Sequence, residues 1–501
     1  MSDLERSASF NTVENVNGGS REDVQASGDR AIVLMDLDNG LIGWEGADDP
    51  ENPQNWTYSQ KWLLMTWVII MCTFSPMISS ICAPGTSLTL EEFNITSRTI
   101  GTLMISIYVL GYAVGPLFLA PLSEMYGRTV VINWSTAFFN AFLLGCSLAP
   151  NMSALIAMRL LAGIGGSAVM TIASSCIGDV FRVHERAAAS AIVIGTPSIS
   201  PILGPILGGF ISQYIGWRWA YWIVMMVTVP VNVLMFWYLR ESNHPTILER
   251  KTRCLRKEMG RDDLRSQLEL KLPPREVLAR SLVRPMKFLF KSPIILMVAL
   301  YASTLYGILY LMLATIPSVF QDIYHFEVQY TGLAYLGFGL GLFTALGFMV
   351  KYNDKKVIKL RDDNGGKFEP EMRLANTIYA APFVPLSLFL YGWTTRPSIH
   401  WIVPCLTFFP FGFGLGGIFI PCQTYAVDAF LETSASAVAV MVFTRSVFGA
   451  FLPLVGPVAY EKLGLGMGNT VLGILALVVT PAPFAFIKWG GQIRRKWPVD
   501  L

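Results

Sequence analysis

The sequence predicts an all-α membrane protein with twelve transmembrane helices in two pseudo-symmetric six-helix halves. Three observations support this fold class. The chain of 501 residues is 53% hydrophobic and only 15% charged, whereas soluble proteins carry about 25% charged residues. Twelve apolar segments each approach the roughly 20 residues that a spanning helix needs. Part of the fourth segment is also repeated in the tenth.

The twelve segments fall into two groups of six, separated by a long polar stretch. The first six cover residues 62–84, 99–121, 130–149, 153–178, 189–214 and 219–239. The last six cover residues 294–317, 331–350, 374–393, 399–424, 436–459 and 468–489. The predicted regions are an N-terminal tail (1–61), an N-terminal half (62–239), a central loop (240–293), a C-terminal half (294–489) and a C-terminal tail (490–501).

The N-terminal tail is polar and rich in Ser, Asn, Asp and Glu. Because of this polar composition, we expect a disordered, acidic cytoplasmic tail; it contains no apolar run of spanning length. The first apolar segment begins near Trp62, which is too late for a signal peptide. Trp44 and Trp56 lie near prolines shortly before that segment, a pattern that suggests an anchor at the membrane interface.

Lysine and arginine are distributed unevenly among the links between segments. They gather in the central loop, in the link after the eighth segment and at the C-terminus, whereas the alternate links hold few cations. Cations collect on the cytoplasmic side of membrane proteins. Both termini and the central loop are therefore predicted to be cytoplasmic, which requires an even number of spans.

An internal repeat relates the two halves. The offset between matching positions is constant, since 412 − 163 = 249 and 428 − 179 = 249. The matching residues are Gly163, Gly165, Asp179 and Phe181 in the first half and Gly412, Gly414, Asp428 and Phe430 in the second. Arg159 has Phe408 as its counterpart, so this cation is peculiar to the first half. Two similar halves joined by a basic loop are typical of a transporter that rocks around a central site.

Four stretches resemble motifs of the major facilitator superfamily, and most of all those of the fungal twelve-helix drug:proton antiporters. Pro121-Leu-Ser-Glu-Met-Tyr-Gly-Arg128 is similar to the loop motif after helix 2, with Glu124 in place of its aspartate. Residues 159–168 resemble the RxxxGxGxA motif of helix 4, and Gly204-Pro-Ile-Leu-Gly-Gly209 resembles the antiporter motif of helix 5. Trp217-Arg218-Trp219 completes the pattern.

This resemblance implies a proton-coupled efflux pump that exports small organic compounds such as toxins, drugs or secondary metabolites. It implies a monomer in the plasma membrane that handles its substrate and protons, binds no nucleic acid and needs no cofactor. The helix 5 motif, which includes Gly204, Pro205, Gly208 and Gly209, is associated with exporters more than with importers.

Arg159 lies within an apolar segment, where a cation costs at least a few kcal/mol unless it faces a partner or a wet cavity. One interpretation is that it faces the central cavity and couples proton movement to substrate movement. The alternative is a structural arginine paired with backbone carbonyls near the outer end of helix 4. For Gly204 to Gly209 the alternatives are a bent helix at the seam between the halves and ordinary small-residue packing.

Glu124 and Arg128 lie four residues apart near a helix end. They could form a charge latch that reaches Asp179, holds the outward-open state and releases in the inward-open one. The alternative is a solvated pair worth well under about 1 kcal/mol. Asp428 is the counterpart of Asp179, and these two aspartates or Glu124 would have to bind the proton, because no carboxylate falls mid-span.

Arg445 is a second cation within a spanning segment, and it either faces the cavity or extends to the cytoplasmic interface. Tyr306, Tyr310 and Phe411 are candidate lining residues of an apolar substrate cavity, although such aromatic residues more often pack internally or face lipid. Asn94-Ile-Thr is a glycosylation sequon in the first outer loop.

The remaining residues exclude several other functions. The four histidines have no metal-ligand spacing, and the seven cysteines mostly lie in apolar spans, as small hydrophobic residues do. No nucleotide-binding loop and no nucleophile with a base is apparent, so an enzyme or a primary pump is not expected. The alternative function is a transporter of a polar solute such as a polyamine, sugar or siderophore, although a polyamine would favour acidic residues in the cavity.

Overall fold

The computed structural model describes residues 35–36, 40–182, 185–198, 200–268, 274–430 and 434–497. The N-terminal half consists of α2 (Tyr58–Ile81), α3 (Thr86–Glu92), α4 (Arg98–Tyr126), α5 (Arg128–Ser147), α6 (Met152–Val180), α7 (Arg186–Gly195), η2 (Thr196–Ser198), α8 (Ser200–Tyr214) and α9 (Arg218–Tyr238). The C-terminal half consists of α12 (Pro293–Tyr324), α13 (Val328–Thr331), η3 (Gly332–Tyr335), α14 (Leu336–Asp363), η4 (Pro370–Asn376), α15 (Thr377–Ala380), α16 (Phe383–Thr394), α17 (Ile402–Ala429), α18 (Ser434–Phe451), η6 (Leu452–Leu454), α19 (Val455–Val479) and α20 (Ala482–Lys496).

Ten helices of the described chain are long and apolar enough to cross a bilayer. One of them, Ser436–Lys496, contains two passes, because Gly464 (φ 71°, ψ 167°) interrupts the helix within α19. A further pass is divided between α7 and α8, with the short η2 turn between them. The ten helices, the second pass within Ser436–Lys496 and the divided pass together make the twelve spans that the sequence predicts.

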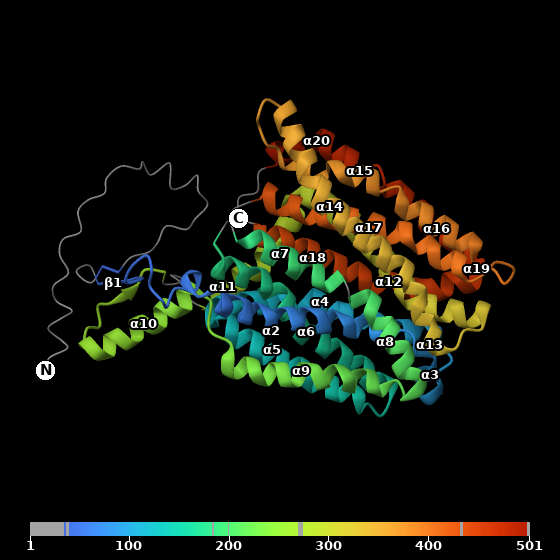
Figure 1. Ribbon diagram of the computed structural model, residues 1–501, viewed down its shortest axis with the longest axis horizontal. Helices are drawn as coiled ribbons and strands as arrows, with labels where there is room; N and C mark the ends of the chain where they lie inside the picture. Colours follow the sequence, from blue (N-terminus) through green and yellow to red (C-terminus); the bar gives the residue numbers. More distant parts are fainter. Residues whose placement is uncertain are drawn as a thin grey trace.

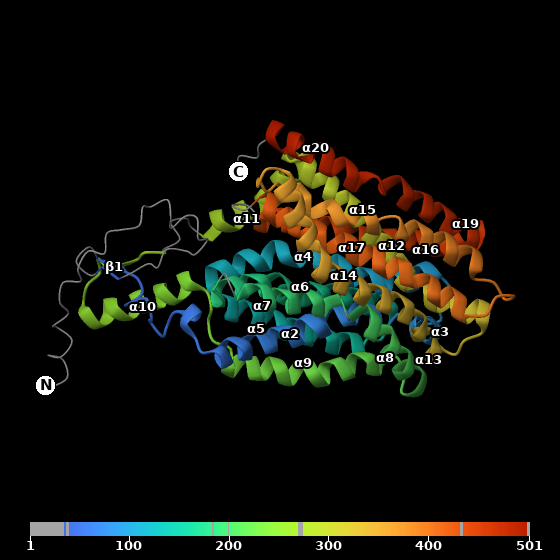
Figure 2. The same ribbon diagram turned by 45° about the horizontal axis from the view of Figure 1, so that its top comes forward.

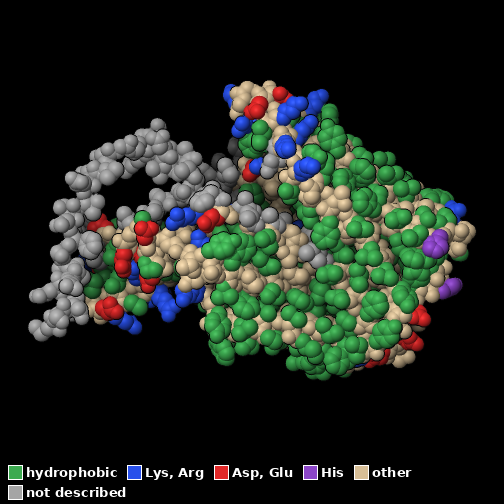
Figure 3. Space-filling model, in the orientation of Figure 1, with side chains coloured by type: hydrophobic (Ala, Val, Ile, Leu, Met, Phe, Trp, Pro, Cys, Tyr) green, Lys and Arg blue, Asp and Glu red, His purple; other side chains and the backbone are tan. Residues whose placement is uncertain are grey.

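The two halves lie side by side along the long axis of the molecule (Figure 1). In both ribbon views α9 lies at one edge of the bundle and α19 and α20 lie at the opposite edge (Figure 2). We call the end at which α2 begins and α20 stops the terminal end, and the end that carries α3 and α13 the far end. Hydrophobic side chains cover the flank between the ends, and most charged side chains gather at the ends (Figure 3).

The internal repeat has a physical basis in helix packing. A Cβ atom added to Gly163 would collide with a backbone carbonyl of α4, and one added to Gly412 would collide with a backbone carbonyl of α14. A Cβ on Gly165 would come within 2.9 Å of a carbonyl of α5, and one on Gly414 would come within 3.1 Å of a carbonyl of α15. The first glycine of each pair therefore lets one neighbouring helix approach and the second lets another approach, in both halves.

The central loop contains more regular structure than the sequence analysis expected. It forms α10 (His244–Met259), β2 (Arg265–Ser266) and α11 (Pro274–Lys291). The signals for α10 are Pro245 in its first turn and Gly260 after its last, where φ is 62°. A search for apolar spans does not detect this helix, because it is polar and rich in cations.

The expectation of a disordered tail and an interfacial anchor is not met over residues 40–57. β1 (Leu41–Ile42) pairs in parallel with β2, and η1 (Pro53–Asn55) follows. Trp44 and Trp56 are both buried in the protein, and the Trp44 ring meets the His244 ring of α10 edge-on at 5.6 Å. The tryptophans therefore join this segment to the protein rather than to the membrane interface. Residues 1–34 lie outside the described part of the chain.

Lys251 of α10 holds the same segment by charge. Its Nζ lies 2.8 Å from a carboxylate oxygen of Glu45 and 3.3 Å from oxygens of Asp49 and Glu51. Burial would raise the pKa of Asp49, but hydrogen bonds from the backbone N–H groups of Glu45 and Glu51 and the charge of Lys251 outweigh it, so this pKa is held below its ordinary value.

Candidate functional site

The terminal end of the N-terminal half is built around a buried ion pair between Arg128 and Asp179. Arg128 Nε lies 3.2 Å from Asp179 Oδ2, and Arg128 Nη1 donates to Ser123 Oγ at 2.7 Å. Only Gly127 separates α4 from α5, and its φ of 99° is one that glycine adopts far more easily than other residues. This tight turn brings Arg128 to the foot of α6, where Asp179 lies.

Glu241, which the sequence analysis did not single out, caps the start of α5. Its carboxylate accepts hydrogen bonds from the backbone N–H of Arg128 at 2.8 Å and of Thr129 at 3.1 Å. It also accepts from the backbone N–H groups of Ser242 and Asn243. Because the first N–H groups of a helix lack partners within the helix, a carboxylate is stabilising there. In the sequence, the only indication of a role for Glu241 was its position directly after the sixth apolar segment.

The predicted latch is only partly formed. Arg128 and Asp179 are paired as expected, but Glu124 is exposed and its side chain makes no ion pair in the described chain. Instead, the backbone carbonyl of Glu124 accepts a hydrogen bond from Asn243 Nδ2 at 3.1 Å. The Arg128–Asp179 pair joins α5 to α6 within one half, so it is not a contact between the halves.

The C-terminal half carries a similar arginine–aspartate pair at the same end. Arg373 Nε in η4 lies 2.8 Å from Asp428 Oδ2 at the foot of α17. The neighbouring Glu371 is buried, and its Oε1 lies 3.2 Å from Arg494 Nε of α20. The repeat identified Asp428, but its arginine partner does not lie at the repeat offset of 249 from Arg128 and was missed.

Arg159 is fully buried and makes no ion pair in the described chain. Its Nη1 donates to the Tyr221 hydroxyl at 2.8 Å, and its Nη2 lies 3.3 Å from the carbonyl of Ile78 and 3.5 Å from that of Ser79. These carbonyls belong to the last turn of α2, where helical carbonyls lack partners and a cation is stabilising. These contacts favour the structural interpretation of Arg159 over exposure to a cavity.

A polar cluster at mid-depth joins residues of both halves. Ser75 Oγ lies 2.6 Å from the Tyr112 hydroxyl and donates to the carbonyl of Gly166 at 2.9 Å. One turn further along α2, Ser79 Oγ lies 3.1 Å from the hydroxyl of Tyr310 on α12. The Ser79–Tyr310 contact connects the two halves through side chains that can exchange hydrogen bonds with a ligand.

Arg445 of α18 borders this cluster. Its guanidinium carbon lies 5.2 Å from the centre of the Tyr306 ring, and its Nε is buried without a hydrogen-bond partner in the described chain. The Tyr306 and Tyr310 rings are 5.0 Å apart. The Arg445 side chain therefore lies beside this cluster and does not extend to the cytoplasmic interface.

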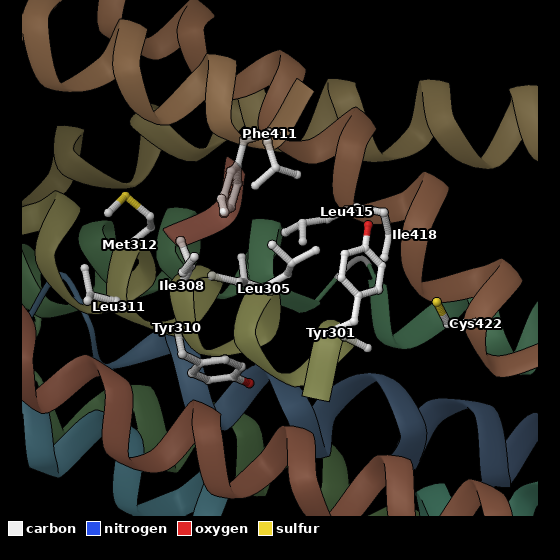
Figure 4. Close-up of a cluster of buried hydrophobic side chains, with 14 of the residues drawn as sticks. Tyr301, Leu305, Ile308, Tyr310, Leu311, Met312, Phe411, Leu415, Ile418 and Cys422 are labelled. Atoms are coloured by element: carbon white, nitrogen blue, oxygen red, sulfur yellow. The ribbon is translucent and has the colours of Figure 1, made fainter. Parts of the chain in front are cut away.

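Phe411, a candidate lining residue of a cavity, packs internally, which was the alternative for such aromatic residues. It is buried in the core of the C-terminal half, where its ring lies 6.0 Å from that of Phe338 on α14. Figure 4 shows Phe411 directed into the apolar cluster around Leu305 and Ile308, whereas Tyr310 points away from that cluster. Periodicity alone could not distinguish these two environments, because aromatic residues occupy both.

The helix 5 motif lies at the seam between the halves. A Cβ on Gly204 or Gly208 would collide with α2, with the Ser80 hydroxyl in the first case and the Ile81 carbonyl in the second. A Cβ on Gly209 would come within 2.9 Å of backbone carbonyls of α13, in the other half. One added to Gly332 of η3 would likewise meet the carbonyl of Pro205. α8 therefore packs closely against both halves.

Charged pairs also lie at the far end. Arg98 Nη1 at the start of α4 lies 2.7 Å from Asp322 Oδ2 near the end of α12, which joins the two halves. Arg218 of the Trp-Arg-Trp sequence pairs with Glu92, and this hydrogen-bonded pairing holds the pKa of Glu92 below its usual range despite partial burial. Asn94, the predicted glycosylation site, is exposed between α3 and α4.

No group of three or more His, Cys, Asp or Glu residues in the described part of the chain could hold a metal ion. The comparisons with known proteins agree with the fold. The family model described as "Major Facilitator Superfamily" matches residues 66–453. The chain belongs to the Major Facilitator Superfamily. This superfamily consists of transporters, so the protein is a multi-pass membrane transporter and not an enzyme.

Curated members of the superfamily are similar over nearly the whole chain. The MFS transporter fsa7 of Fusarium sp. is 39% identical over 97% of this chain and 95% of its own. The MFS-type transporter penM of Penicillium rubens is 41% identical over 91% and 90%. Efflux pump radE of Floropilus chiversii is 39% identical over 91% and 85%. These relatives place the chain among fungal transporters of the superfamily.

Solved structures of the superfamily share the fold. The xylose transporter XylE from E. coli, in a partially occluded inward open conformation, aligns with a TM-score of 0.62 at 14% identity, covering 85% of this chain and 98% of its own. A bacterial homologue of the lysosomal transporter Spinster, inward-facing and unoccupied, aligns with a TM-score of 0.58 at 14% identity, covering 89% and 100%. At this identity the likeness concerns the fold alone.

Proposed function

We propose that this transporter is a proton-coupled exporter of small organic compounds, a monomer in the plasma membrane with its terminal end in the cytoplasm. The observation that carries the proposal is the position of α8, whose motif glycines pack against α2 of their own half and α13 of the other. A similar relative named as an efflux pump supports the direction of transport.

The contacts at the far end suggest which state of the transport cycle the structure represents. Gly209 meets α13 across the seam, and Arg98 pairs with Asp322 across the same end. These contacts must break for the far end to open. With the terminal end in the cytoplasm, closure of the far end corresponds to an inward-facing or occluded state, and cargo would enter from the cytoplasm. The Arg128–Asp179 pair is intact in it, so if the state is inward-facing this pair would not be the latch that releases in the inward-open state.

The mid-depth cluster is the proposed cargo site. Ser75 and Tyr112 contribute from the N-terminal half, and Tyr306, Tyr310 and Arg445 contribute from the C-terminal half. Aromatic faces suit apolar cargo, and an arginine that has no carboxylate partner in the described chain suits neutral or anionic cargo better than cationic cargo. These residues therefore weigh against a polyamine transporter.

The proton step is assigned to carboxylates at the terminal end, because no carboxylate lies at mid-depth of the described spans. Asp179 and Asp428 each have an arginine partner, and Glu371 is buried beside Arg494. An opposite charge favours the ionised carboxylate, so separating the arginine would favour proton uptake. If helix movement separates an arginine from its carboxylate in one state of the transport cycle and reunites them in the other, proton binding is linked to that movement.

The test is an efflux assay with Gly209→Val and the matched control Gly178→Val. A valine at position 209 would meet the carbonyls of Val328 and Gln329 and hinder closure of the far end, whereas a Cβ at position 178 would meet nothing within 4 Å. We expect cells with the native chain to keep a fluorescent apolar dye low and an uncoupler to remove this effect. Gly209→Val should lose efflux at normal membrane levels, and the control should retain it.

The outcomes distinguish the possibilities. Dye uptake that rises with the native chain would indicate an importer, and efflux that persists without a proton gradient would exclude proton coupling. Orientation is tested separately at Asn94. If the far end faces outward, glycosidase should shift the mobility of the native chain but not that of Asn94→Gln. A tag accessible from outside the cell at the C-terminus would contradict the proposed orientation.

A further inference from the structure

A basic groove lies at the terminal end of α14, outside the proposed transport site. It has a volume of about 450 Å³ and is open to the surroundings. Its walls carry three lysines from the last turns of α14 and three aromatic rings from α14 and α15. The lining includes Lys355, Lys356, Lys359, Phe348, Tyr352 and Tyr379. Figure 3 shows Lys and Arg side chains gathered over this end of the molecule.

The length of the helix places this groove at the boundary of the bilayer. The continuous pass Val328–Asp363 has 36 residues, about 54 Å at 1.5 Å per residue, whereas the hydrocarbon core is about 30 Å thick. Lys351 is the first charged residue after the apolar run that starts at Leu336. The groove begins beside Lys351, so it lies where the apolar flank of the helix meets the headgroup layer.

The aromatic residues are arranged as at a membrane interface. Tyr352 is 44% exposed and Tyr379 is 61% exposed, although both are large and apolar over most of their surface. The Phe348 ring lies 4.9 Å from that of Tyr352, and Lys356 Nζ lies 6.0 Å from the centre of the Tyr379 ring. Tyrosine is enriched at the headgroup level, where its ring contacts apolar groups and its hydroxyl stays solvated.

Among the described residues, the lysines of the groove have no carboxylate partner. None of Lys355, Lys356 and Lys359 makes an ion pair in the part of the chain that the structure describes. The carboxylates of the following segment are engaged elsewhere, Glu369 with Arg495 at 2.9 Å and Glu371 with Arg494. Three cations without a carboxylate partner among the described residues, beside an apolar, aromatic wall, favour an anion that also has an apolar part.

We propose that this groove binds the headgroup of an anionic phospholipid. The lysines would contact its phosphate and other anionic headgroup oxygens, and the three aromatic rings would cover the glycerol and the first methylene groups. Basic pockets between transmembrane helices bind lipid headgroups in this way. A soluble anion would use the lysines but leave the aromatic wall exposed, and an ordinary solvated charge run would need neither the rings nor the groove.

The test measures binding of short-chain anionic lipid to the full-length protein in detergent. The probes are dioctanoyl phosphatidylserine and dioctanoyl phosphatidylinositol phosphate, with dioctanoyl phosphatidylcholine as the neutral lipid. The variant combines Lys355→Gln, Lys356→Gln and Lys359→Gln. The control makes the same charge change at exposed lysines of α10 and α11, with Lys257→Gln, Lys287→Gln and Lys291→Gln.

We expect the groove variant to bind at least one anionic lipid about tenfold or more weakly than the native chain, and the control to change by less than about twofold. Phosphatidylcholine should bind weakly to all three proteins. Equal losses in the variant and the control would show only a diffuse effect of net charge and would overturn the proposal. Free inositol phosphate or inorganic phosphate that binds as tightly as the lipid would also overturn it, because the site would then be one for a soluble anion.

Discussion

The two halves of the transporter hold an arginine and an aspartate together at the terminal end, but in different surroundings. The Arg128 and Asp179 side chains are only 10% and 8% exposed, whereas those of Arg373 and Asp428 are 27% and 25% exposed. In the first half a single glycine joins α4 to α5. In the second, α14 continues to Asp363 and η4 starts only at Pro370.

The difference shows that two equivalent ion pairs need not contribute equally to the free energy of unfolding. The short turn at Gly127 and the cap by Glu241 enclose the first pair, and enclosure removes water from both charges. The longer connection in the second half leaves its pair partly solvated and leaves room for the basic groove of α14. Burial, rather than the presence of the pair, should therefore decide what each half loses when the pair is broken.

The largest expected effect comes from breaking each pair with the same substitution. Asp179→Asn leaves the buried Arg128 without a counter-charge, so we expect the free energy of unfolding to fall by about 3 kcal/mol. Asp428→Asn should cost less than about 1 kcal/mol, because water can solvate Arg373. Thermal unfolding of the full chain in detergent measures both. Equal losses would show that exposure does not govern the difference.

A second prediction concerns Gly163 and Gly412, at which the two halves should lose similar amounts of stability. Gly163→Ala and Gly412→Ala each place a Cβ against a backbone carbonyl of a neighbouring helix, so each should cost about 1 to 3 kcal/mol. Gly178→Ala and Gly347→Ala are matched controls, because a Cβ there meets nothing within 4 Å. The controls should stay within about 0.5 kcal/mol of the native chain. A tolerated change at only one of the paired glycines would argue against equivalent packing.

A third prediction concerns Arg159, which has no counterpart cation in the second half. Arg159→Lys keeps the charge but loses the planar fork that reaches both Tyr221 and the end of α2. We expect a loss of about 1 to 2 kcal/mol. Tyr221→Phe should cost less in the Arg159→Lys background than in the native one, since the shared hydrogen bond is already weakened. If the losses in stability from Arg159→Lys and Tyr221→Phe are additive, the two side chains are not energetically coupled, and Tyr221 is not the partner of Arg159.

The smallest effect concerns the segment at residues 40–57, which docks on α10. Because the pKa of Asp49 is held below its ordinary value, its contribution to docking should be complete above about pH 4 and should fade as the pH drops further. The hydrogen-exchange protection factors of residues 40–57, which correct for the slower intrinsic exchange in acid, should fall at low pH while those of α5 stay high. In Lys251→Met the protection factors of the same segment should be lower at neutral pH and should change less in acid.

Much of the fold follows from local sequence patterns, because each spanning helix must be apolar for about 20 residues. The repeat also located Asp179 and Asp428. The partners of these residues were not predictable in the same way. Glu241 and Arg373 lie in polar links between helices. The conformation of such a link depends on its turns, and hydrophobic periodicity does not predict turns.

The interpretation of single side chains was least reliable from sequence. Arg159 and Arg445 look alike, as isolated cations in apolar segments. The first meets the carbonyls at the end of α2, and the second meets the Tyr306 ring beside the other half. Phe411 was a candidate for a cavity, with internal packing as the alternative, and it lies in a core. Such differences depend on which helices become neighbours, which no local pattern specifies.

The docking of residues 40–57 on α10 also offers an optical measurement. A dye at exposed Asp48 would move with the N-terminal half, because Arg182 after α6 donates a hydrogen bond to Asn55 at 3.0 Å, and a dye at exposed Asn364 would move with the C-terminal half. Of the seven native thiols only Cys254 is exposed, so a single serine replacement would clear the background for cysteine labelling. Energy transfer between the two dyes would then record each rocking cycle of one molecule in real time.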